Sequence, residues 1–126
     1  MQVSSTPSFK ANFLHSASLE KVVDYAVERG KFAKLNEARK NIESQDFFTK
    51  ILLTCGFNEE KQQSFLKIVR FKPKYIYKDG KIFKDYMVKV TKRYYNESNP
   101  LKLAYNKIIK MSKNAPNNKL YEEMIK

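Results

Sequence analysis

A stripe of apolar residues with the period of a helix is the first clear pattern in the chain. Its members recur three and four positions apart: Leu19, Val22, Val23, Ala26 and Val27. This spacing predicts a helix with one buried face. Ser18 is the candidate N-cap of that helix, and Gly30 is the candidate stop because glycine enters the left-handed region without a steric penalty.

A second helical stripe follows at once, through Leu35, Ala38 and Ile42. The two stripes predict either a pair of helices or one long helix that bends at Gly30. Ahead of them, apolar and polar residues alternate over 9–13, which is typical of a short half-buried strand.

The hydrophobic period then changes from that of a helix to that of a strand. Apolar residues share one face of a first strand at Ile51, Leu53, Cys55 and Phe57, and one face of a second at Phe65, Val69 and Phe71. The polar link over 58–63 has the length of a hairpin loop, so a hairpin is expected at about 50–72. Pro73 lacks a backbone donor, and the second strand should therefore end there or lie at a sheet edge.

Residues 82–95, which follow a turn signal at Asp79-Gly80, fit two templates. Along helical positions the segment is apolar except at Arg93, whereas along alternate positions it is interrupted at Lys84 and Lys92. The count narrowly favours a helix. A strand stays the alternative, because the segment is also rich in β-branched residues.

The C-terminal part of the chain again has helical spacing. Asn99-Pro100 is a good helix opening, and the stripe that follows is Leu101, Ala104, Tyr105, Ile108 and Ile109. A break near Pro116 precedes a last short helix at 120–125. The sequence thus predicts an α+β fold: an N-terminal helix pair, a small antiparallel sheet and C-terminal helices packed on it. Residues 1–8 form a flexible lead-in, and 9–126 form a single domain.

Charge is distributed unevenly along the 126 residues, whose net charge is +12. Residues 1–60 hold eight basic and eight acidic residues, so the whole excess lies in 61–126. A lysine-rich composition alone would spread the charge along the chain. Segment 67–93 instead concentrates it in ten basic residues: Lys67, Arg70, Lys72, Lys74, Lys78, Lys81, Lys84, Lys89, Lys92 and Arg93.

Aromatic residues are interleaved with these basic residues: Phe65, Phe71, Tyr75, Tyr77, Phe83, Tyr86, Tyr94 and Tyr95. Lysines that follow phosphates beside rings that stack on bases are a recognised arrangement for binding single-stranded nucleic acid. Core packing of the rings and a solvated lysine face explain the pattern equally well. Arginine, which makes most bidentate base contacts, is scarce, so any binding should be electrostatic and weakly sequence-selective.

Residues suited to catalysis are few. The chain has one histidine, His15, and one cysteine, Cys55, with no P-loop, HExxH or dinucleotide-binding motif. Cys55 lies in an apolar run, where a thiol usually acts as a small buried hydrophobe. Glu20, Asp24 and Glu28 recur four positions apart, which fits a solvated helix face better than a metal-dependent nuclease site. No enzymatic activity, metal or cofactor is expected.

These observations favour a non-enzymatic protein whose segment 67–93 binds a polyanion, in the first place DNA or RNA. The alternative is a protein–protein interaction or assembly module, with the lysines solvated or facing an acidic protein partner. An anionic membrane surface ranks third and enzymatic activity last. No stretch approaches the ~20 apolar residues of a membrane span, and no secretory pattern opens the chain, so an intracellular, cytoplasmic protein is expected.

Overall fold

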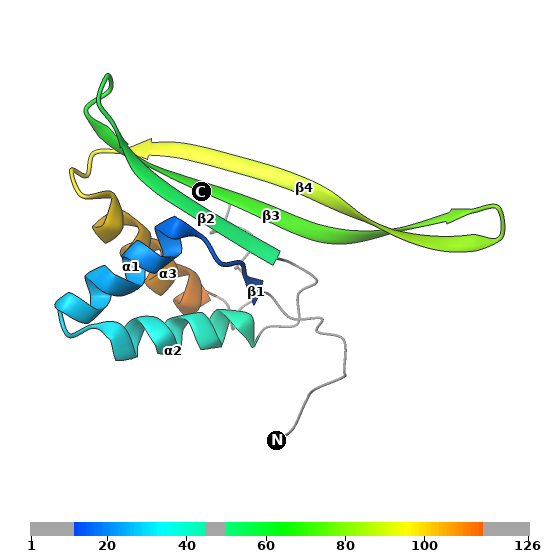
Figure 1. Ribbon diagram of the computed structural model, residues 1–126, viewed down its shortest axis with the longest axis horizontal. Helices are drawn as coiled ribbons and strands as arrows, with labels where there is room; N and C mark the ends of the chain where they lie inside the picture. Colours follow the sequence, from blue (N-terminus) through cyan, green and yellow to red (C-terminus); the bar gives the residue numbers. More distant parts are fainter. Residues whose placement is uncertain (1–11, 45–49, 115–126) are drawn as a thin grey trace.

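Seven helices and strands make up the part of the chain that the computed structural model describes, residues 12–44 and 50–114 (Figure 1). In chain order they are β1 (Asn12–Phe13), α1 (Ala17–Glu28), α2 (Phe32–Glu43), β2 (Lys50–Asn58), β3 (Gln63–Lys78), β4 (Lys81–Tyr95) and α3 (Pro100–Asn114). This confirms the predicted α+β class. The lead-in expected at 1–8 and the short helix expected at 120–125 lie outside the described residues.

The two N-terminal stripes form two separate helices, joined at Gly30, whose φ of 66° is the left-handed conformation expected of it. The N-cap of α1 is Ser16, and the prediction of Ser18 is wrong: Ser16 Oγ accepts a hydrogen bond from Leu19 N at 3.0 Å. The Ser18 hydroxyl instead accepts one from Cys55 N at 3.2 Å. Ser18 therefore ties α1 to β2, a role that depends on a strand far away in the sequence.

The four strands form one sheet in the order β1-β2-β3-β4. β2 and β3 are antiparallel, with Lys50 opposite Phe71 and Asn58 opposite Gln63, which confirms the hairpin predicted at about 50–72. β4 runs antiparallel to β3, while the two-residue β1 runs parallel to β2. The sheet is thus mixed, where the sequence indicated an antiparallel one.

Residues 81–95 form strand β4, so the helix narrowly favoured over 82–95 is wrong. The turn before the strand explains the outcome. Asp79 and Gly80 have φ values of 53° and 74°, the two positive values of a type I′ turn. Because the twist of this turn matches that of a hairpin, it returns the chain alongside β3, where β-branched and aromatic residues fit a pleated ribbon.

β3 continues through Pro73 to Lys78, so the strand does not end at the proline. Pairs in an antiparallel ladder alternate between hydrogen-bonded and non-hydrogen-bonded types. Counted from the Lys78–Lys81 pair beside the turn, Pro73 and Tyr86 form a non-hydrogen-bonded pair. The donor that proline lacks would therefore have pointed away from β4. On that side the described part of β2 has already ended opposite Phe71, so Pro73 lies at an edge of the sheet, as the sequence allowed.

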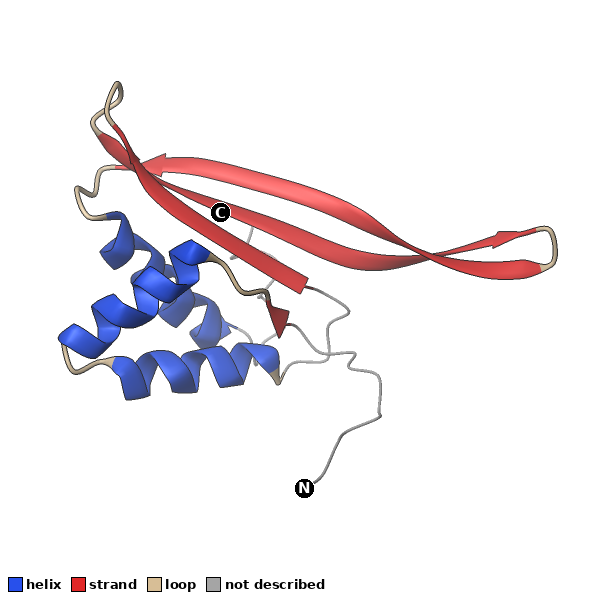
Figure 2. Cartoon of the chain, viewed as in Figure 1, coloured by secondary structure: helices blue, strands red, loops and turns tan. Residues whose placement is uncertain are grey.

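Helix α3 begins as predicted, because Asn99 Oδ1 accepts a hydrogen bond from Leu101 N at 3.0 Å. Ser64 holds the connection between β4 and α3 in place: its backbone N–H and its hydroxyl both donate to the carbonyl oxygen of Glu97. Ser64 is fully buried. Helix α3 packs on the same side of the sheet as α1 and α2 (Figure 2).

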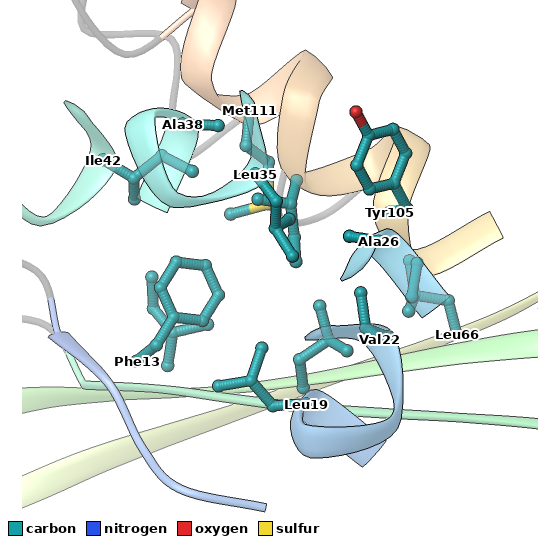
Figure 3. Packing of buried hydrophobic residues seen from close by; sticks show 14 of the residues in the cluster. Phe13, Leu19, Val22, Ala26, Leu35, Ala38, Ile42, Leu66, Tyr105 and Met111 are labelled. Atoms are coloured by element: carbon teal, nitrogen blue, oxygen red, sulfur yellow. The ribbon is translucent and has the colours of Figure 1, made fainter. Parts of the chain in front are cut away.

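The hydrophobic core lies between these helices and one side of β2 and β3 (Figure 3). Its fully buried members come from all three helices and from β2, with Leu35, Ile51 and Ile108 among them. β3 adds Leu66 and Ile68, whereas no β4 residue belongs to the buried cluster formed by the described residues. The other side of the sheet is covered by none of the described helices (Figure 2).

Candidate functional site

The β3–β4 hairpin reaches well past the helices, as Figure 1 shows. We call its part beyond the end of β2, residues 72–87, the arm. Its seven cross-strand pairs, from Lys72 with Met87 to Lys78 with Lys81, span roughly 23 Å at about 3.3 Å per residue. The two strands cross in Figure 1 before they reach the turn, which reflects the strong twist of a two-stranded ribbon.

An unbroken register assigns every hairpin residue to one of two faces. β3 and β4 pair without a bulge along their whole length, so successive side chains lie on opposite faces throughout. Even-numbered residues of β3 and odd-numbered residues of β4 share the ladder face of Leu66 and Ile68, which enter the core at the base of the hairpin, and this face turns with the twist of the ribbon along the arm. We call this the helix-side face. The remaining residues of the two strands form the outer face.

The ten predicted basic residues divide unequally between these faces. Seven lie on the helix-side face: Arg70, Lys72, Lys74, Lys78, Lys81, Lys89 and Arg93. The other three, Lys67, Lys84 and Lys92, lie on the outer face. The structure thus brings together most of the predicted site but not all of it.

Basic residues follow the helix-side face over the full length of the arm. Arg70 pairs with Lys89 near the base of the arm, and Lys78 pairs with Lys81 beside the turn. The one acidic residue of strands β3 and β4 is Asp85, opposite Lys74. Positive charge therefore dominates this face, although Ile76, Phe83 and Met87 are also exposed on it.

The outer face of the hairpin is mainly apolar and aromatic. Tyr77 is 74% exposed, Ile82 is 70% exposed and Val88 is 57% exposed. Tyr75, Tyr86 and Val90 are also exposed on this face. The alternative that the arm's aromatic rings pack in the core is therefore wrong, because these rings lie outside the helix-covered region.

Lysines on the outer face, and Lys50 of the neighbouring strand β2, lie against aromatic rings. The Nζ atoms of Lys50 and Lys84 lie 5.4 Å and 5.3 Å from the centre of the Tyr86 ring. Lys92 Nζ lies 4.5 Å from the centre of the Phe65 ring. A hydrogen bond with Lys84, together with the positive charges of Lys50 and Lys84, lowers the pKa of Tyr86 below its ordinary value of 10.0.

The nucleophilic and acid–base candidates lie apart from the arm. His15 is exposed and pairs with Glu20, Nε2 to Oε2, at 3.2 Å. Burial raises the pKa of the Cys55 thiol, against a smaller lowering effect of the hydrogen bond with Ser18. A thiol held protonated in this way is a poor nucleophile, which agrees with the structural role predicted for Cys55.

Acidic residues do not gather into a site in the described ranges. Glu20, Asp24 and Glu28 are all exposed on α1, as a solvated face requires. Within residues 12–44 and 50–114, no group of three or more His, Cys, Asp or Glu side chains is placed to hold a metal ion. In the same ranges, no helix has the length and apolar character needed to cross a membrane.

Sequence reasoning missed two features of the hairpin. It did not find Lys50, which comes from β2 and meets Tyr86 only because β2, β3 and β4 are neighbours. It also missed the division into faces, although the spacing of Arg70, Lys72 and Lys74 by two residues was a signal of a shared face. Comparisons with protein-family models, with curated proteins and with solved structures found no match.

Proposed function

We propose that the protein binds nucleic acid, without catalysing a reaction on it, through the helix-side face of the β3–β4 hairpin. The observation that carries this proposal is the placement of seven basic residues on one ladder face of the β3–β4 hairpin, four of which, Lys72, Lys74, Lys78 and Lys81, lie in the arm that protrudes from the core. Side chains in the arm are exposed wherever their burial is described, so their charges are accessible to a large ligand.

Electrostatics favour a polyanion as the ligand. The chain carries a net charge of +12, and the helix-side face concentrates much of it within two strands. Such a row of like charges repels itself unless solvent or a partner neutralises it. A phosphate backbone presents negative charges at regular intervals, and its release of counterions makes the association favourable at low salt.

The shape of the arm favours a duplex groove. The major groove of B-form DNA is about 12 Å wide and admits a two-stranded β-ribbon. The major groove of A-form RNA is deep and narrow, so double-stranded RNA is the less suitable partner. Because lysine makes few bidentate base contacts, the arm is expected to read the backbone more than the sequence.

The test is a salt titration of binding, measured by fluorescence anisotropy with labelled duplex DNA, single-stranded DNA and RNA. The wild-type affinity should fall steeply with salt. The variant Lys74→Gln/Lys78→Gln should flatten the slope of log K against log salt by about 0.9 for each phosphate contact that it removes from duplex DNA.

The matched control is Lys21→Gln/Lys40→Gln, which removes the same charge from exposed positions on α1 and α2. It should leave the slope close to that of the wild type. If the protein binds none of the three probes even at low salt, or if both double variants weaken binding equally, the arm is not a nucleic-acid interface.

A second candidate function, docking of an acidic protein partner, is favoured by the exposed outer face. Tyr77, Ile82 and Val88 present apolar surface there, and such surface often marks a protein interface. A second copy of this chain is disfavoured as the partner, because the outer-face lysines of the two copies would repel one another. The same titration separates the two functions, since a protein-docking module should be indifferent to all three nucleic-acid probes.

A further inference from the structure

A pocket of about 390 Å³ lies where the start of α2 meets α3, away from the β3–β4 hairpin. Four lysines line it, two from each side, together with three residues of α3: Lys31, Lys34, Lys110, Lys113, Tyr105, Asn106 and Ile109. None of these residues is acidic. Four lysine side chains around one hollow favour an anion as its ligand.

The start of α2 adds to the positive potential of the pocket. Its N-cap residue, Lys31, gives no side-chain hydrogen bond to the first turn, and that turn contains no acidic residue. Free backbone N–H groups and the helix dipole favour negative charge at this position. The side chains that the sequence places there, Lys31 and Lys34, are cations, so the helix start itself lacks the anion that would stabilise it.

A buried hydroxyl in the pocket wall gives an independent indication of a ligand. Tyr105 is only 5% exposed, and its hydroxyl has no hydrogen-bond partner among the described residues. In Figure 3 this hydroxyl points away from the aliphatic cluster that contains Val22 and Leu19. Buried hydroxyls nearly always have a partner, so an unpartnered one beside a pocket indicates a missing acceptor.

The state of the Tyr105 phenol matches that role. Burial, with a smaller contribution from Tyr25, raises the pKa of Tyr105, so the phenol stays protonated and able to donate. Lys31 Nζ lies 5.6 Å from the centre of the same ring. Phosphate oxygens accept hydrogen bonds from neutral hydroxyls and from ammonium groups. The Tyr105 phenol and Lys31 supply one of each.

We propose that the α2–α3 pocket is a phosphate-binding site, in which Tyr105 donates a hydrogen bond to the ligand and the four lysines neutralise its charge. A second pocket of about 190 Å³ shares Asn106 and Lys110 with it and extends to Tyr95 at the end of β4. The site goes beyond the function proposed for the arm and does not rest on it.

The experiment uses the full chain and pyrophosphate as the probe, with the melting temperature and the calorimetric Kd as readouts. Sodium sulfate at equal ionic strength controls for general screening of a basic protein. Pyrophosphate should raise the melting temperature more than sulfate does, since a ligand that binds the folded state stabilises it by mass action.

Two variants test the named residues. Tyr105→Phe keeps the ring and should raise the Kd about tenfold, which is the usual effect of losing one hydrogen bond to a charged group. Its ligand-free melting temperature should not fall, because the hydroxyl has no partner to lose among the residues that the structure describes. Lys34→Gln/Lys113→Gln should weaken binding at least as much, while Lys40→Gln on α2, outside the pocket, should bind as the wild type does.

Three results would overturn the proposed phosphate site: no stabilisation beyond that of sulfate, equal binding by Tyr105→Phe and the wild type, or a lower ligand-free melting temperature for Tyr105→Phe.

A competition experiment identifies the kind of molecule that carries the phosphate. It compares a nucleoside diphosphate with 5′-phosphorylated and 5′-hydroxyl oligonucleotides. Displacement of pyrophosphate only by the nucleotide supports a small ligand, and displacement by the oligonucleotides supports a strand. The arm variant Lys74→Gln/Lys78→Gln should keep the wild-type Kd for pyrophosphate, which separates this site from the arm.

Discussion

The base and the tip of the β3–β4 hairpin consist of the same two strands in different surroundings. At the base, Leu66 and Ile68 are buried under the helices, whereas at the tip Tyr77 and Ile82 are largely exposed. Burial of apolar surface stabilises the base. The tip depends on its backbone ladder and its turn, since an isolated two-stranded hairpin is marginally stable in water. The described side chains of the arm are exposed to solvent and contribute little to the hydrophobic core.

The largest expected contrast between the two regions is in stability. Ile108 is fully buried and Ile82 is 70% exposed, so the same substitution probes both surroundings. Ile108→Ala should lower the free energy of unfolding by about 2–5 kcal/mol through lost burial and a cavity. Ile82→Ala should change it by no more than about 0.5 kcal/mol. Urea unfolding measures both, and a comparable loss for Ile82→Ala would mean that the arm packs against something.

A smaller contrast is expected at two glycines with positive φ, Gly30 at 66° and Gly80 at 74°. Space for a Cβ is open at both, so the cost of alanine is backbone strain of about 1 kcal/mol. Gly30→Ala should lower the global free energy of unfolding by that amount, because Gly30 joins two core helices. Gly80→Ala should leave it unchanged and speed amide hydrogen exchange in the arm alone. A global loss in Gly80→Ala would show that the arm and the core unfold as one unit.

The smallest effect concerns the titration of Tyr86 on the outer face. Lys84→Gln should raise the pKa of Tyr86 towards 10.0, because it removes both a hydrogen bond and a positive charge. The ¹³Cζ chemical shift of Tyr86, followed against pH, measures this pKa. Lys78→Gln, on the helix-side face, is the control and should leave it unchanged. If the pKa of Tyr86 is the same in Lys84→Gln as in the wild type, the side chains of Tyr86 and Lys84 are not in contact.

The same titration has a defined effect on stability. Because the pKa of Tyr86 is lower in the folded state than in the unfolded state, the unfolded state binds more protons at pH values between the two. Stability should therefore rise with pH through this interval, and the gain should be lost as the pH falls through the folded pKa. The effect should be slight, since Tyr86 is solvent-exposed.

Local signals in the sequence predicted the elements whose formation depends on neighbouring residues. The stripes of α1, α2 and α3, the stop at Gly30, the cap at Asn99 and the turn at Asp79-Gly80 all appear as expected. Each of these rests on spacing or on a backbone preference within a few positions. Predictions failed at the N-cap of α1, where Ser16 and not Ser18 accepts the hydrogen bond from Leu19 N, and along 82–95, where the counts for a helix and for a strand were close.

The sequence predicted the candidate site only in part, because the position of several basic residues depends on contacts between distant segments. Charge counting found segment 67–93, but the assignment of Lys84 and Lys92 to the outer face required the strand register. Lys31 and Lys34 lie in a half of the chain whose net charge is zero, so no count of charge indicated them. They meet Lys110 and Lys113 only because α2 packs against α3.

The sequence by itself determined the α+β class, the helix pair, the hairpin at about 50–72 and the place of the positive charge, because periodicity, turn chemistry and composition are properties of neighbouring residues. Only the tertiary structure decided that 81–95 is a strand, that β3 runs past Pro73 as an arm and that seven of ten basic residues share a face. These outcomes depend on pairing between distant segments. A strand is completed by its partner's backbone, and a face exists only once the register is set.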